Sequence, residues 1–235
     1  MSSFTGKLYL IPNLIGDTPI DYVIPSFIKM KVTEIKYYIV ENERNARRYL
    51  KKLNKEVIID NLCFYELNKH TSETDIYSYL LECENGNDVG LLSDAGIPCV
   101  ADPGNVIVKM AHNKGIRVIP LAGPSSIFMA LMASGLNGQN FAFNGYIPIE
   151  KENRISKLKS LENRSKKENQ SQIFMDTPYR NNKLLEDILL NMNNDTYLCI
   201  AYNISMPDEY IVTKRISEWK KITVDLNKKP CIFIV

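Results

Sequence analysis

The chain has 235 residues, of which 45% are hydrophobic and 24% are charged, with a formal net charge of +2. This balance is typical of a folded globular protein with one large domain or two modest ones, and it excludes disordered and fibrous architectures. It also lacks the strongly basic character of a dedicated nucleic-acid-binding domain. Nine of the 11 glycines lie between Gly86 and Gly145, and none follows. A chemical site is therefore expected in that glycine-rich region.

The chain is expected to be cytoplasmic, with no membrane segment. No run approaches the roughly 20 apolar residues that span a bilayer, and Met1 to Lys7 lack the apolar core of a signal peptide. The five cysteines are widely spaced, without a Cys-x-x-Cys pair or a companion histidine at ligand spacing. We expect them to be reduced thiols in the core, and we expect no metal site.

Short apolar segments alternate with helical patterns in the first half of the chain. Strands are predicted at Lys7 to Pro12, Ile35 to Val40, Asp88 to Ser93 and Ile116 to Leu121. Helices are predicted at Glu43 to Leu53, Ser72 to Cys83, Asn105 to His112 and Ser125 to Ala133. This alternation predicts a mainly parallel sheet that helices cover on both faces.

After Gly145 the pattern changes. Lys151 to Asn169 is a long, lysine-rich segment with a thin apolar stripe. Further strands are predicted at Gln172 to Met175, Thr196 to Asn203, Tyr210 to Lys214 and Cys231 to Val235, with a helix at Tyr179 to Asn191 and a short one through Trp219. The last strands follow one another too closely for helical crossovers, so a mixed sheet is expected. We predict two α/β domains, residues 1–121 and 122–235.

The segment from Ser93 to Gly104 (SDAGIPCVADPG) is the strongest candidate for a ligand site. It begins where a predicted parallel strand ends, which is the edge where open α/β sheets bind ligands. Its glycines and prolines favour a rigid, tightly turned loop. Asp94 and Asp102 have two explanations, as ligand contacts or as residues that close a turn and cap the helix at Asn105. The density of special residues favours the ligand site.

A second loop, Pro120 to Ser126, places a glycine, a proline and two hydroxyls between a strand and a helix. Amides at a helix N-terminus attract anionic or polar ligand groups, although either serine is equally explained as an N-cap. Neither loop has a Walker lysine sequence, and no G-x-G-x-x-G follows Pro12. A nucleoside triphosphate or a dinucleotide is therefore disfavoured.

Six segments follow one another along the chain: Pro12 with Gly16-Asp17, Ser93 to Pro98, Asp102-Pro103-Gly104, Pro120 to Ser126, Gly145 to Pro148, and Thr177 to Arg180. In order and spacing, nearly end to end, they resemble the motifs of the tetrapyrrole-methylase-like, class III S-adenosylmethionine methyltransferases. The most similar branch is that of the ribosomal small-subunit RNA cytidine 2′-O-ribose methyltransferases. The resemblance therefore implies a methyltransferase.

The resemblance also implies a homodimer of two α/β domains that hold S-adenosylmethionine in the cleft between them. The residues that would line the cofactor are Pro12, Ser93, Asp94, Ala95, Gly96, Val100, Ala101, Ser125, Ser126, Thr177, Tyr179, Ala201, Tyr202 and Pro230. Asp94 is suited by its charge to the cofactor's amino group or to a ribose hydroxyl.

Two segments depart from the RNA-modifying branch. Where that branch carries an acidic-Asp-Thr-Arg segment, this chain reads Glu41-Asn-Glu-Arg44, which keeps the arginine and a carboxylate. Where the branch carries an Arg-Glu-Leu-Thr-Lys run, the segment Ala201 to Met206 loses both charges and the lysine. The resemblance therefore supports the use of S-adenosylmethionine by this chain more strongly than it supports an RNA acceptor.

A ribose acceptor needs a base, which adds roughly 10²- to 10⁴-fold to the rate when it lies within hydrogen-bond reach. The candidates are Glu41, Glu43 and His70, the last of which is equally explained as a solvated or helix-capping residue. Arg44 and Arg47 are the candidate substrate contacts, on a basic helix face that could position phosphates. The alternative is that this face is simply solvated.

Three hypotheses follow for the function. The leading one is methyl transfer to a ribose of ribosomal RNA, with the rRNA or the small ribosomal subunit as partner. The second keeps the cofactor and changes the acceptor to a small molecule such as a tetrapyrrole. The third is a catalytically silent protein that binds S-adenosylmethionine or RNA.

Overall fold

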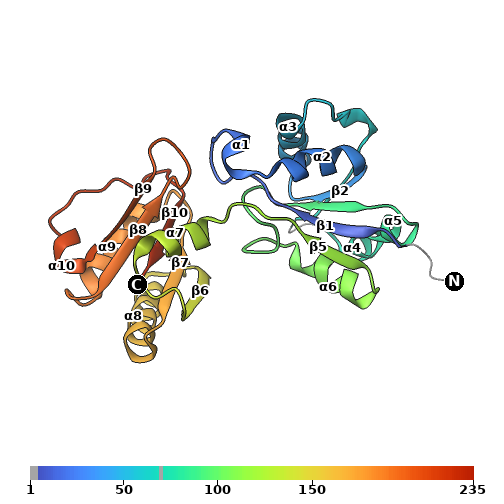
Figure 1. Ribbon diagram of the computed structural model, residues 1–235. Coiled ribbons are helices and arrows are strands. Elements are labelled where there is room, and N and C mark those ends of the chain that lie inside the picture. Colours follow the sequence, from blue (N-terminus) through green and yellow to red (C-terminus); the bar gives the residue numbers. More distant parts are fainter. Residues whose placement is uncertain (1–4, 69–70) are drawn as a thin grey trace. The chain divides into compact units, whose positions relative to one another are not determined.

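A computed structural model describes residues 5–68 and 71–235. The chain divides into two compact units, unit 1 (Met1–Ser125) and unit 2 (Ser126–Val235). Each unit has its own sheet with helices packed on it (Figure 1).

Unit 1 is built on sheet A, in which all neighbouring strands are parallel. The strand order is β3 (Cys63–Glu66), β2 (Tyr37–Val40), β4 (Val89–Leu92), β1 (Lys7–Ile11) and β5 (Arg117–Pro120). The predicted parallel sheet is confirmed. Strand β3 was not predicted, although Leu62 to Tyr65 form a short apolar run, and it lies at the edge of the sheet with side chains that are exposed or half-buried.

Helices cover both faces of sheet A (Figure 1). One core cluster joins the sheet to α1 (Ile20–Val23), α2 (Ser26–Glu34) and α3 (Glu43–Leu53). The other core cluster joins sheet A to α4 (Glu73–Ser78), α5 (Leu81–Glu84) and α6 (Asn105–Asn113). A short 3-10 helix, η1 (Ile59–Asn61), precedes β3.

The prediction of one helix from Ser72 to Cys83 is wrong. The helix breaks at Tyr79 and Leu80, which separate α4 from α5. Both side chains are buried, and the Tyr79 hydroxyl donates to the Glu66 carbonyl at 2.6 Å. The break between α4 and α5 is therefore tied to the end of β3 by the Tyr79 side chain.

Unit 2 is built on sheet B, a mixed sheet as predicted. The strand order is β6 (Phe141–Tyr146), β7 (Ser171–Met175), β10 (Cys231–Ile234), β8 (Tyr197–Tyr202) and β9 (Tyr210–Arg215). Strands β6 and β7 are parallel, and the other pairs are antiparallel. Strand β6 was not predicted, because its register shifts between Phe143 and Tyr146, around Gly145 at φ +67°.

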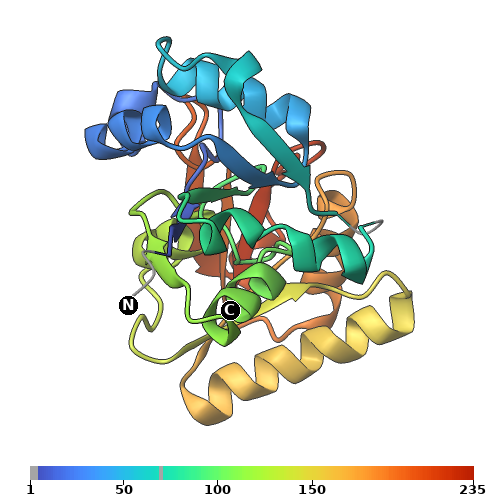
Figure 2. The same cartoon turned by 90° about the vertical axis from the view of Figure 1, so that its right-hand side faces the viewer.

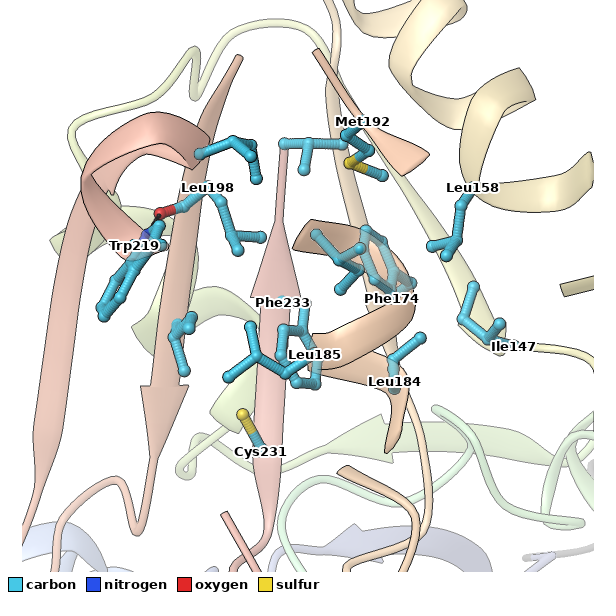
Figure 3. Packing of buried hydrophobic residues seen from close by; sticks show 14 of the residues in the cluster. Ile147, Leu158, Phe174, Leu184, Leu185, Met192, Leu198, Trp219, Cys231 and Phe233 are labelled. Atoms are coloured by element: carbon cyan, nitrogen blue, oxygen red, sulfur yellow. Dashed lines mark hydrogen bonds between the residues drawn. The ribbon is translucent and has the colours of Figure 1, made fainter. Parts of the chain in front are cut away.

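Three helices share the core of unit 2 with one face of sheet B: α8 (Lys151–Glu168), which Figure 2 shows as one long rod, α9 (Asn181–Asn191) and α10 (Ile216–Trp219). In Figure 3 the rings of Phe174 and Phe233 lie at the centre of this core, 5.8 Å apart, and the Trp219 ring nitrogen donates to the Leu198 carbonyl at 2.9 Å. The remaining helix, α7 (Ser126–Ser134), packs on β9 and β10.

A buried ion pair joins α8 to α9. Arg154 Nε donates to Asp187 Oδ2 at 2.7 Å, and the two side chains are only 9% and 2% exposed. Arg154 also donates to the backbone carbonyl of Ile149, just after the predicted Gly145 to Pro148 segment. The guanidinium therefore fixes both the pair of helices and the chain that enters α8.

All five cysteines are free thiols. Cys83, Cys199 and Cys231 are buried and Cys99 is half-buried, but the prediction of core thiols is wrong for Cys63, which is exposed on the edge strand β3. Burial raises the pKa of the Cys83 thiol to about 12. Within residues 5–68 and 71–235, no helix has the length and apolar character to cross a membrane, and no three potential ligands form a metal site.

Candidate functional site

Four predicted segments meet at one edge of sheet A. Strands β1, β2, β4 and β5 run in the same direction in register, so their carboxyl ends lie together. Pro12 follows β1, Glu41 follows β2, Ser93 follows β4, and the second predicted loop follows β5. We call this the carboxyl edge of sheet A. It is the edge at which open α/β sheets bind ligands.

Asn13 ties the end of β1 to the loop after β4. Its side-chain amide donates to the carbonyls of Ser93 and Asp94, at 3.1 Å each, and its backbone N–H donates to the Gly96 carbonyl at 2.8 Å. The Ser93 hydroxyl donates to the Ala95 and Gly96 carbonyls. Sequence reasoning missed Asn13, although its place directly after Pro12 on a strand end was the available signal.

Asp94 is exposed, but its position is fixed from several sides. Its backbone N–H donates to Glu41 Oε1 at 2.8 Å, and its own Oδ2 accepts from Asn45 Nδ2 at 3.0 Å. Asn45 lies in the first turn of α3, so the segment between β2 and α3 holds both the backbone and the carboxylate of Asp94. A preorganised, accessible carboxylate is well suited to a cationic or hydroxyl-bearing ligand.

The three candidate bases differ in their surroundings. Burial raises the pKa of Glu41, and the negative charges of Asp102 and Asp94 add to this, while the hydrogen bond from the Asp94 amide opposes it. Glu43 accepts from Arg47 at 2.8 Å. His70 lies outside the described residues. Of the two candidate bases that the structure describes, Glu41 is therefore the one that combines contact with the Asp94 backbone and a raised pKa.

Glu41→Gln is expected to remove a destabilising contribution that grows as pH rises. A carboxyl group with a raised pKa in the folded chain destabilises that chain as pH rises from the unfolded pKa through the folded one, because the charged form is disfavoured. Glutamine cannot ionise, yet it keeps an oxygen for the Asp94 amide. Relative to wild type, the variant should gain stability from about pH 4 to pH 7.

Urea unfolding across that pH range measures this effect. The matched control is Glu56→Gln, at an exposed position just after α3. A stability difference between Glu41→Gln and wild type that stays constant over the range would contradict the expectation.

The rest of the first loop presents Val100 and Ala101 at the surface. Below them the loop is braced by Asp102, which accepts the N–H groups of Cys99 and Gly104, each at 2.7 Å. Burial raises the pKa of Asp102, against the effect of these two hydrogen bonds. The sequence allows Asp102 two roles, and these contacts are those of a residue that closes a turn.

The second loop passes directly against Pro12. A Cβ atom on Gly123 would lie 2.1 Å from the Pro12 Cβ, so only glycine fits there. The Pro12 carbonyl accepts from the Tyr49 hydroxyl at 2.6 Å, which joins it to α3. Ser125 ends unit 1, and Ser126 begins α7 in unit 2.

Arg44 and Arg47 lie beside a surface hollow of about 530 Å³, lined by Asn42, Glu43, Arg44, Arg47, Arg48 and Glu66. Arg47 is paired with Glu43 and with Asp60, at 2.8 and 3.1 Å. Arg44 is exposed and forms no ion pair with any residue that the structure describes. Of the two predicted substrate residues, Arg44 is the one available to a new anion.

The predicted residues of unit 2 gather at one end of sheet B. The end of β7 lies beside the start of β10, and Cys231 pairs with Tyr202 at the end of β8. Thr177 and Tyr179 follow β7, Ala201 and Tyr202 end β8, and Pro230 precedes β10. Of these, Ala201 is fully buried and Tyr179 is 76% exposed.

Hydrogen bonds and ring contacts join these segments of unit 2. Asn181 Nδ2 donates to the Lys229 carbonyl at 2.7 Å, and the Asn203 N–H donates to the Pro230 carbonyl at 3.1 Å. The Tyr202 ring stacks on Tyr210 with centroids 4.9 Å apart, and Lys229 Nζ lies 4.2 Å from the Tyr202 ring centroid. The loops that follow β7 and β8 are thus connected through the residues before β10.

Comparison with known proteins shows similarity over nearly the whole chain. A family model described as Tetrapyrrole (Corrin/Porphyrin) Methylases matches residues 34–220. Ribosomal RNA small subunit methyltransferase I of Buchnera aphidicola subsp. Schizaphis graminum is 32% identical over 98% of this chain and 78% of that protein. The protein of the same name from Escherichia coli O157:H7 is 28% identical over 98% of this chain and 77% of that protein.

The crystal structure of the methyltransferase CobJ has a similar fold, with a TM-score of 0.64 over 98% of this chain and 94% of that chain. Its sequence is 14% identical, so this likeness concerns the fold alone. Together with the two sheets described above, it confirms the predicted fold class of parallel and mixed α/β units.

Proposed function

The chain belongs to the tetrapyrrole (corrin/porphyrin) methylase family and is a methyltransferase, and we propose that it transfers a methyl group from S-adenosylmethionine to a ribose 2′-hydroxyl of ribosomal RNA. The observation that carries the proposal is the carboxyl edge of sheet A, where hydrogen bonds with Asn13, Glu41 and Asn45 fix the first loop and the exposed carboxylate of Asp94. The names of the two relatives support the RNA acceptor.

The donor set at this edge fits the proposed cofactor. Asp94 would accept a hydrogen bond from the amino group or a ribose hydroxyl of S-adenosylmethionine, and the cofactor would lie along the backbone of the first loop. The full set proposed to line it is Pro12, Ser93, Asp94, Ala95, Gly96, Val100, Ala101, Ser125, Ser126, Thr177, Tyr179, Ala201, Tyr202 and Pro230.

For methyl transfer, the main task of the protein is to align the acceptor with the methyl group of the cofactor. S-adenosylmethionine supplies a methyl group already activated by its positively charged sulfur, so the residues of the chain need to orient the acceptor and exclude water. Glu41 is the proposed base for the ribose hydroxyl, because burial raises its pKa toward the working pH. Arg44, with Arg47 beside it, would hold a phosphate of the RNA.

Asp94→Ala is expected to weaken S-adenosylmethionine binding about 10- to 100-fold, the usual effect of losing a hydrogen bond to a charged group. Isothermal titration calorimetry with S-adenosylmethionine and S-adenosylhomocysteine measures the affinity. The matched control is Asp21→Ala in the same unit, where an exposed carboxylate is paired with Lys29. Wild-type affinity in Asp94→Ala would count against this site.

The acceptor is tested by mapping 2′-O-methylation on small-subunit rRNA from a deletion strain, and by adding the purified enzyme to that rRNA. A missing methyl group that the enzyme restores is the expected result. Unchanged rRNA would contradict the RNA acceptor, and methyl transfer to a tetrapyrrole instead would favour the small-molecule alternative. With an rRNA acceptor, we expect the enzyme to act in the cytoplasm.

We also propose that the chain forms a homodimer. Analytical ultracentrifugation tests this.

A further inference from the structure

The backbone from Cys99 to Ala101 is held in a conformation that its side chains disfavour. Cys99 has a φ of 69° and Ala101 a φ of 64°, in the left-handed region where a residue with a Cβ atom is strained. Two such residues stand within three positions at the exposed tip of the first loop. A strained segment of this kind persists only where neighbouring groups fix it.

The carboxylate of Asp102 holds the strained segment in place through two hydrogen bonds. Its Oδ2 accepts from the Cys99 N–H and its Oδ1 from the Gly104 N–H, both at 2.7 Å, so the two bonds enclose the strained residues. The approach is close, because a Cβ on Gly104 would lie 2.9 Å from Asp102 Oδ1. Short hydrogen bonds to a carboxylate are among the stronger ones in proteins.

We propose that Asp102 is a positioning residue of the methyltransferase, which holds Val100 and Ala101 in the conformation that receives the cofactor. The inference rests on the proposed function, because Val100 and Ala101 are among the residues assigned to S-adenosylmethionine. Asp102 acts through the loop and not by contact with the cofactor. Its role also differs from capping, since no side chain caps α6.

The test combines loss of the carboxylate with relief of the strain. In Asp102→Asn the amide keeps one acceptor oxygen and turns a donor toward the other backbone N–H. We expect about tenfold weaker S-adenosylmethionine binding, as for one lost charge-assisted hydrogen bond. Adding Cys99→Gly should recover at least part of that loss, because glycine adopts a positive φ without strain. Cys99 is outside the proposed cofactor contacts.

Cys99→Ala in the same background is the matched control. It removes the thiol as glycine does but keeps the Cβ, so the difference between the two double variants measures the strain alone. Calorimetry gives the affinities. Hydrogen exchange of the backbone amides between residues 97 and 104, prolines excepted, gives a second readout in the ligand-free protein. The exchange rate should rise in Asp102→Asn and fall again when Cys99→Gly is added.

Wild-type affinity and wild-type exchange in Asp102→Asn would overturn the inference, as would equal recovery by the glycine and alanine variants. If Asp102→Asn does not fold, the same cycle with Asp102→Glu, which keeps both oxygens but displaces them, should give the same order. A wild-type protein that does not bind S-adenosylmethionine would refute the proposed function. Unchanged exchange in Asp102→Asn would refute the positioning role separately.

Discussion

Asp187→Ala should lower the free energy of unfolding of unit 2 by about 3–5 kcal/mol, because it leaves the buried Arg154 guanidinium without its carboxylate. The Arg154 side chain is 9% exposed and that of Asp187 is 2% exposed, so little water reaches the pair in the folded chain. The effect should appear in urea unfolding followed by fluorescence. Trp219 is the single tryptophan of the chain and lies in the core of unit 2, so its signal reports on that unit.

Two further variants distinguish the loss of the buried ion pair from the loss of any ion pair on α8. Glu168→Ala removes an exposed ion pair with Arg164 on the same helix α8, where both side chains are 46% exposed, and should cost less than about 1 kcal/mol. The double variant Arg154→Met/Asp187→Leu removes both charges and should recover much of the loss, since no buried charge remains unpaired. A small effect of Asp187→Ala, equal to that of Glu168→Ala, would show that the buried pair adds little.

Gly123→Ala is expected to damage the carboxyl edge of sheet A. A Cβ atom 2.1 Å from the Pro12 Cβ cannot be accommodated, so the second loop and the end of β1 must move apart. Overpacking of this kind costs about 1–3 kcal/mol of stability. Because both segments belong to the proposed cofactor site, S-adenosylmethionine affinity should fall at least about tenfold, the equivalent of 1.4 kcal/mol.

The control for Gly123→Ala is Gly138→Ala, where an added Cβ meets nothing within 4 Å. It should leave both affinity and stability close to wild type. Calorimetry with S-adenosylmethionine and thermal unfolding by circular dichroism measure the two properties. An unchanged affinity in a folded Gly123→Ala variant would place the cofactor away from this edge.

The sequence predicted the regular, buried elements well. Strand β4 is buried at all four positions, and its apolar run identified it, while α3 begins and ends as its apolar spacing predicted. Strand β3 and the helices α1 and α2 were not predicted. Edge strands and short helices bury too few side chains to leave a clear period in the sequence.

The candidate site shows a similar division. The loops were found because glycine and proline constrain the backbone locally, which a sequence displays directly. The side chains that brace the loops were missed, since Asn13 lies 80 residues from Ser93 and Asn45 lies 49 from Asp94. Contacts of that separation depend on the order of strands in sheet A, which the sequence does not state.

The exposed thiol of Cys63 gives unit 1 a site for chemical labelling, because the other four cysteines are buried or half-buried. Unit 2 contains the only indole of the chain, Trp219. One dye on Cys63 therefore forms a single donor–acceptor pair with one member in each unit, and no residue needs to be introduced. Energy transfer between them, measured with and without S-adenosylmethionine, follows the distance between the two units in solution.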